Sequence, residues 1–145
     1  MQENGIKTMG QKVALQDLAT EIANRLIRKG FAVHRYNAYS TNSIYLKLDF
    51  GVCNSIRISD HHGKKHLKYR YNIGADIKKI ETKQDQYPRH YFPASEVDRL
   101  IQKIVEDRKL KQKRYGMDAY ERYMKENKEK QGTEAGFWSK AYRVL

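Results

Sequence analysis

The spacing of hydrophobic residues changes along the chain, and each spacing predicts a different kind of element. Between residues 12 and 29, apolar side chains recur every three or four residues, as in a helix with one buried face. They are Leu15, Leu18, Ala19, Ile22, Ala23 and Leu26. Gly30 follows Arg28 and Lys29, and a glycine after basic residues is typical of a helix end. The sequence therefore predicts a helix over residues 12–29.

From residue 31 to residue 77 the apolar residues alternate with polar ones, which predicts strands with one buried face. Such runs cover residues 31–36, 43–50 and 67–73, and another surrounds Ile56 and Ile58. In the second run Tyr45, Lys47 and Asp49 fall on the face opposite the apolar one. Short turns separate the runs, so we expect an antiparallel meander of about four strands.

The second half of the chain returns to helical spacing. Pro88 and Pro93 mark residues 78–94 as a loop. A second helix follows, with Ser95 as its candidate N-cap residue, and continues into the basic segment 108–116. The tail has aromatic side chains that could dock, including Tyr120, Phe137 and Trp138. We expect an α+β fold of order α-β-β-β-β-α. Residues 1–115 would form the core domain and residues 116–145 a helical C-terminal extension.

Charge limits the classes of partner. The 29 Lys and Arg residues against 17 Asp and Glu residues give a net charge of +12. Nine basic and three acidic residues fall within 31–80, so this segment carries +6, half of the total. No apolar run approaches the roughly 18 residues of a membrane span, and the N-terminus lacks the order of a signal peptide. The single Cys53 fits a reducing cytoplasm. We expect a soluble, cytoplasmic protein that binds nucleic acid or an acidic partner and does not bind a membrane.

The basic residues of the strands point to a binding face. They lie opposite the apolar face or at the tip of a hairpin, and Tyr45 shares their face; they are Lys47, Arg57, Lys64, Lys65, Lys68 and Arg70. Lys and Arg neutralise phosphates, and tyrosines stack on bases. Asp49 is the only acid in this series. A second basic group, Lys109, Lys111, Lys113 and Arg114, lies at the end of the second helix. The alternative is that these charges simply solvate the outer surface.

A cluster at the hairpin tip contains metal-ligating residue types, namely Asp60, His61, His62 and His66. Adjacent His61 and His62 on an extended segment would point to opposite sides, and no cysteine pair accompanies them. Glu81-Thr82-Lys83 forms an E-x-K triplet that would need a further carboxylate to hold Mg²⁺. We therefore expect a non-enzymatic protein without a metal or cofactor, and a metal-dependent nuclease is the lesser alternative.

Residues 43–73, and the strand Ile-Arg-Ile-Ser-Asp-His at 56–61 above all, resemble small proteins of phages and mobile elements in Firmicutes. One type among these is the anti-CRISPR inhibitors of Cas9. The resemblance implies a protein of the host bacterial cytoplasm that disables an RNA-guided nuclease by binding it or its ribonucleoprotein complex. An alternative is a free module that binds RNA or DNA directly, because the element order is similar to that of double-stranded-RNA-binding domains.

Overall fold

The structure is a computed structural model that describes residues 3–38, 43–59, 66–70, 89–133 and 136–145. Side chains are described from Leu15 onward within these ranges, except those of residues 66–70 and Arg89. The elements in chain order are α1 (Glu3–Arg28), β1 (Val33–Asn37), β2 (Ile44–Leu48), η1 (Asp49–Gly51), β3 (Asn54–Ser59), β4 (His66–Arg70), β5 (Arg89–Pro93), η3 (Ala94–Glu96), α3 (Val97–Tyr115), α4 (Met117–Lys130), η4 (Phe137–Lys140) and β6 (Tyr142–Arg143).

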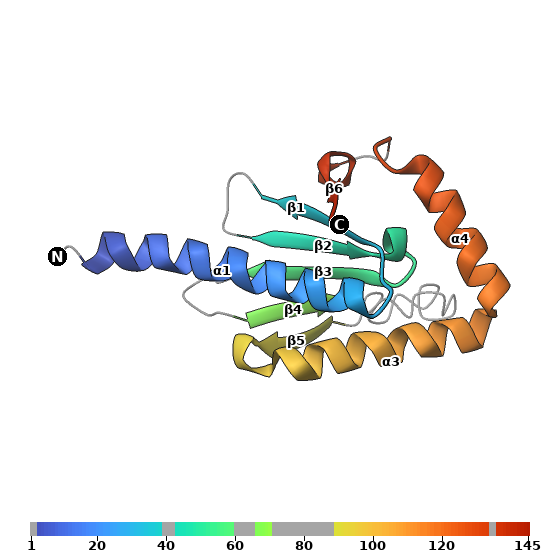
Figure 1. Cartoon of the computed structure of the whole chain (residues 1–145), viewed down its shortest axis with the longest axis horizontal. Helices are drawn as coiled ribbons and strands as arrows, with labels where there is room; N and C mark the ends of the chain where they lie inside the picture. Colours follow the sequence, from blue (N-terminus) through green and yellow to red (C-terminus); the bar gives the residue numbers. More distant parts are fainter. Residues whose placement is uncertain (1–2, 39–42, 60–65, 71–88, 134–135) are drawn as a thin grey trace, which may run out of the picture.

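The described strands form one antiparallel sheet in the order β5-β4-β3-β2-β1-β6 (Figure 1). Strands β1 to β4 are the meander that the alternating sequence predicts, and helices flank the sheet. The α+β fold is confirmed. Strands β5 and β6 extend the sheet at its two edges and were not expected from the sequence.

The prediction of a loop over residues 78–94 is wrong for residues 89–93, which form β5 and pair with β4. Pro93 is its last residue. Proline cannot donate a ladder hydrogen bond, but this matters little at an edge strand, where one side has no partner. Pairing with β4 therefore overrides the two prolines that suggested a loop. The rest of the predicted loop, except Ala94 in η3, lies outside the described residues.

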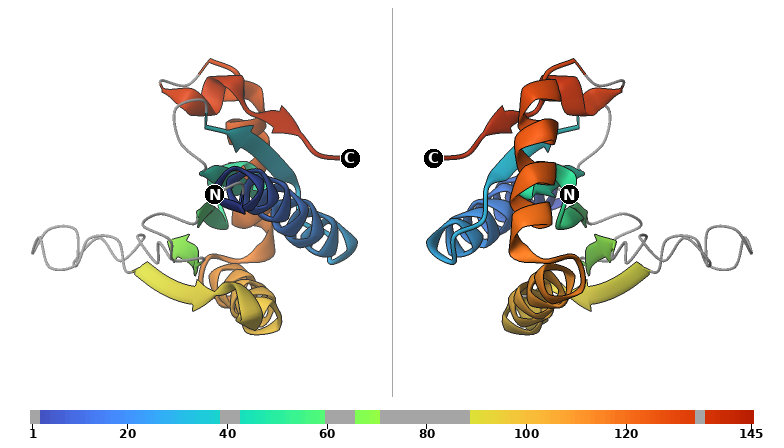
Figure 2. Two further views of the ribbon diagram at one scale, coloured as in Figure 1. Left: turned by 90° about the vertical axis from the view of Figure 1, so that its left-hand side faces the viewer. Right: turned by 90° about the vertical axis from the view of Figure 1, so that its right-hand side faces the viewer.

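Helix α1 covers one face of the sheet and begins at Glu3, earlier than the predicted residue 12. Its apolar stripe is buried as predicted, with Leu18 only partly so. Gly30 has φ 88°, a conformation that glycine adopts without strain, and it follows the helix end as expected. Helix α3 lies on the same side of the sheet as α1 (Figure 2). The two helices and the inner sheet face enclose the core, whose fully buried members include Ile22, Leu46, Ile56, Leu100 and Ile104.

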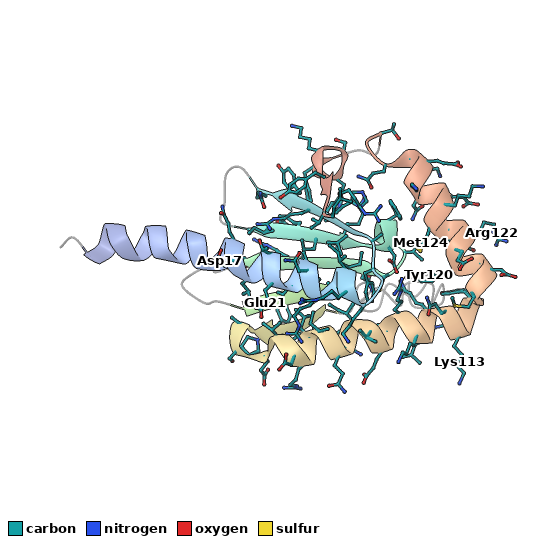
Figure 3. All side chains as sticks on the ribbon, viewed as in Figure 1. Asp17, Glu21, Lys113, Tyr120, Arg122 and Met124 are labelled. Atoms are coloured by element: carbon teal, nitrogen blue, oxygen red, sulfur yellow. The ribbon has the colours of Figure 1, made fainter. Side chains whose placement is uncertain are left out.

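Helix α3 begins at Val97 with Glu96 as its N-cap residue, so Ser95, which lies in the 3-10 helix η3, is not the N-cap that the sequence predicted. It ends at Tyr115, and the next residue, Gly116, has a φ of 89° and a ψ of 150°, in a region that is essentially open to glycine alone. The chain turns there and starts α4. Tyr120 and Met124 lie on the side of α4 that faces the sheet, whereas Arg122 points away (Figure 3). The C-terminal residues 116–145 thus contribute the buried Tyr120 and the edge strand β6 to the same fold as residues 1–115.

A buried carboxylate fastens the turn between β2 and β3. Asp49 follows the end of β2 and has φ 51°, so it leaves the strand and is fully buried. This corrects its expected place on the outer face. Its Oδ1 accepts a hydrogen bond from Ala32 N at 3.0 Å, and its Oδ2 accepts one from the Tyr120 hydroxyl at 2.5 Å. The Arg108 Nε lies 2.9 Å from the same Oδ2. Three distant segments therefore meet at one carboxylate.

Candidate nucleic-acid interface

The strands contain positive charge and no negative charge. None of the six described strands contains an aspartate or a glutamate, because Asp49 lies beyond the end of β2. Their basic residues are Arg35, Lys47, Arg57, Lys68, Arg70, Arg89 and Arg143. Arg35 belongs to the inner face, since its Nη1 donates to the Thr20 hydroxyl of α1. An acid-free sheet suits an anionic ligand.

The strand register aligns the candidate residues in rows across the sheet. The first row, from β1 to β5, is Tyr36, Tyr45, Arg57, Lys68 and Tyr91. Neighbouring strands are about 4.8 Å apart, so the row extends for about 19 Å. A second row runs parallel to it through His34, Lys47, Ser55, Arg70 and Arg89. The predicted residues of the three strands β2, β3 and β4 are thus neighbours on one sheet.

One end of the first row is an aromatic cluster that includes residues from the C-terminal segment. The cluster consists of Tyr36 and Tyr45 from the sheet and Phe137 and Trp138 from η4. Phe137 stacks on Tyr36 with ring centroids 4.8 Å apart and an interplanar angle of 24°. Its centroid is also 4.6 Å from that of Tyr45 and 4.8 Å from that of Trp138. The sequence marked Tyr45 as a stacking residue but did not reveal what stacks on it.

Two of the predicted cations contact this cluster. The Lys47 Nζ lies 5.0 Å from the Trp138 ring centroid and donates to Gln131 Oε1 at 3.3 Å. The Arg57 guanidinium lies 5.9 Å from the Tyr45 ring centroid, and its Nε and Nη2 donate to the Ser43 hydroxyl at 3.2 and 3.1 Å. Both charges are only partly buried. They are therefore held in place while remaining within reach of solvent.

The other end of the first row is Tyr91 on the edge strand β5, whose side chain is 52% exposed. Lys68 and Arg70 lie in β4, where only the backbone is described, and their register places them opposite Arg57 and Ser55. Lys64 and Lys65, at the predicted hairpin tip, lie outside the described residues.

The four basic residues at the end of α3 differ in exposure: three are exposed and one turns inward. Lys109, Lys113 and Arg114 are exposed, and Lys113 points away from the sheet (Figure 3). Lys111 instead turns inward, and its Nζ donates to the Val52 carbonyl at 2.6 Å. Burial lowers the pKa of the Lys111 ammonium. This contact helps to hold the β2–β3 turn.

The other perturbed groups are buried near the same turn. Burial raises the pKa of the Cys53 thiol to about 12 and also raises the pKa of the Tyr120 hydroxyl. Both groups stay protonated at neutral pH, and a protonated, buried thiol is a poor nucleophile. No group of three or more metal-ligating residues occurs within the described ranges. Asp60, His61, His62 and the E-x-K triplet lie outside those ranges, and so does the side chain of His66.

Among the described helices, none is long and apolar enough to cross a membrane. On the outer sheet face, rows of cations and aromatic rings lie side by side. Searches against known protein families, curated proteins and solved structures found no match.

Proposed function

We propose that the protein binds single-stranded nucleic acid non-enzymatically on its outer sheet face. The observation that carries this proposal is the first row, in which Tyr36, Tyr45, Arg57 and Tyr91 align across an acid-free sheet. Flat rings offer stacking surfaces for bases of any sequence, while the cations between them neutralise phosphates. Sheet faces with aromatic residues are a recurrent way of binding unpaired RNA.

The partner that we propose is the ribonucleoprotein of a Cas9-like RNA-guided nuclease, which the protein would inhibit. Support for it comes from the resemblance of residues 43–73 to small phage proteins, and from the charge. An RNA-guided nuclease carries unpaired guide RNA and displaced single-stranded DNA, both of which are anionic ligands for a basic aromatic face. The alternative partner is free RNA or DNA, which the same face would bind.

The proposal is tested by titrating labelled single-stranded RNA and DNA of about 12 nucleotides, a length within the range of known single-strand sites. Fluorescence anisotropy would be measured at several salt concentrations, with duplexes of the same sequence as competitors. Tyr91→Ala should weaken binding roughly 5- to 150-fold, because one stacked base contributes about 1–3 kcal/mol. Arg57→Gln should weaken binding too and reduce the salt slope by about 0.7 if one phosphate contact with a single strand is lost.

Arg122→Gln is the matched control. It removes the same single charge as Arg57→Gln, but Arg122 lies on α4 and points away from the sheet (Figure 3). If both substitutions weaken binding equally, net charge and not the sheet face is responsible, and the proposed site is wrong. Thermal melts of each variant would show that the fold is intact. Inhibition of a guide-loaded Cas9-like nuclease by the same variants, in the same order of strength, would identify the ribonucleoprotein as the partner.

A further inference from the structure

The C-terminal segment, residues 136–145, occupies part of the proposed binding face. Its Phe137 ring lies between three other rings, stacked on Tyr36 and within 4.6 Å and 4.8 Å of the centroids of Tyr45 and Trp138. A nucleobase stacks on an aromatic side chain in the same near-parallel way. The first row therefore ends in a slot for a flat ring, and the protein's own phenylalanine fills it.

A small set of contacts holds the segment there: β6 pairs with β1 over two residues, Val144 packs against the core, and the Arg143 guanidinium lies 5.4 Å from the Phe50 ring centroid. Strand β6 has two residues, both exposed, and one backbone hydrogen bond joins Val144 N to Val33 O at 2.9 Å just beyond it. Gln131 Nε2 donates to the Trp138 carbonyl at 3.1 Å. At the start of the segment Gly136 has φ 82°. This attachment is small beside the five-residue pairing of β1 with β2.

The charges also oppose a tight attachment. Residues 136–145 contain Lys140 and Arg143 and no acidic side chain. Among the described residues, the outer face that they cover carries Lys47 and Arg57 and no acidic side chain, and only the cation–π contact of Lys47 with Trp138 attracts the segment to one of these charges. A basic segment thus lies on a basic face, where like charges repel, whereas a nucleic-acid strand would be attracted. Salt screens this repulsion, so the segment should cover the slot more firmly as salt rises.

We infer that the slot filled by Phe137 is a nucleobase site and that the C-terminal segment is a cover displaced when a single strand binds. This inference rests on the proposed function and adds a mode of regulation to it. The cover competes with the ligand, so the apparent affinity is reduced by the fraction of molecules in which the slot is closed. Any change that loosens the cover should strengthen binding.

Trp138 reports on the cover directly, because it is the only tryptophan in the chain and lies in the aromatic cluster. The full-length protein would be titrated with oligouridylate and oligothymidylate while both the Trp138 emission maximum and anisotropy are recorded. Saturation should shift the emission to longer wavelength as Trp138 leaves the cluster for water. Phe137→Ala should bind about 2- to 10-fold more tightly, since it removes a stacked aromatic pair.

Tyr142→Ala is the control within the same segment, because Tyr142 is 50% exposed and is not part of the aromatic cluster. Its affinity should match that of the unaltered protein. Phe137→Tyr keeps a ring in the slot and should restore ordinary affinity. Far-UV circular dichroism melts would confirm that each variant is folded.

The possible outcomes separate this inference from the proposed function. If Phe137→Ala binds equally well or more weakly, and ligand quenches Trp138 without a shift, the segment is part of the binding surface. The inference is then overturned, and the proposed function stands. If neither the unaltered protein nor Phe137→Ala binds any single strand, both are overturned. Binding by Phe137→Ala alone would support both, with the cover closed in nearly all molecules.

Discussion

The buried carboxylate of Asp49 allows a sharp test of how α4 is attached. Tyr120→Phe removes one hydroxyl group and leaves the ring, so no cavity forms around the fully buried side chain. The lost interaction is the 2.5 Å hydrogen bond from the hydroxyl to Asp49 Oδ2. A hydrogen bond to a charged group contributes about 1.5–3 kcal/mol, and we therefore expect the free energy of unfolding to fall by about 2 kcal/mol.

Urea unfolding followed by circular dichroism measures this change. In a separate thermal melt, the melting temperature should fall by roughly 4–8 °C, given about 2–4 °C per kcal/mol for a chain of this size. Asp49 keeps the Ala32 N–H and the Arg108 guanidinium as partners, so the variant should still fold cooperatively. Asp49→Asn should cost more, about 3–5 kcal/mol, because it leaves the charge of Arg108 uncompensated.

Tyr123→Phe is the matched control. It makes the same chemical change on the same helix at a side chain that is 43% exposed, and it should alter stability by less than about 0.5 kcal/mol. The double variant Asp49→Asn/Tyr120→Phe should cost less than the sum of its parts, because both substitutions act on one hydrogen bond. A loss for Tyr120→Phe no larger than that of the control, or strict additivity in the double variant, would refute the network.

Two further predictions concern the same region of the fold. Burial raises the Cys53 thiol pKa from 9.0 to about 12, so above pH 9 the unfolded state loses a proton that the native state keeps. Between pH 9 and 12 this contribution lowers the free energy of unfolding by about 1.4 kcal/mol per pH unit, and it is absent below pH 9. Urea midpoints at pH 8 and 10 should therefore diverge less in Cys53→Ala than in the unaltered protein; equal divergence would contradict the assignment. Gly116→Ala meets no atom within 4 Å, so its expected cost of about 1–3 kcal/mol comes from backbone strain alone. A thermal melt that Gly116→Ala leaves unchanged would show that the corner between α3 and α4 can relax.

Much of the fold follows from local patterns in the sequence. The helical stripe from Leu15 to Leu26 and the alternation in β1 to β3 each report which side of an element is buried, and the structure buries those sides. Strands β5 and β6 were missed because each is short and has weak strand signals. Both strands are stabilised by pairing with a neighbouring strand. Such pairing cannot be predicted from the five residues of β5 or the two residues of β6 alone.

For the candidate site, too, some features follow from the sequence and others only from the tertiary structure. The sequence by itself determined that Lys47, Arg57 and Tyr45 share a sheet face, because alternation along a strand sets the side on which each residue lies. Only the tertiary structure decided that Asp49 is buried and that the C-terminal segment covers one end of that face. Asp49 meets Tyr120, and Tyr36 meets Phe137, across long separations in the chain. These contacts depend on how distant elements pack together, and the local spacing of apolar residues does not predict that packing.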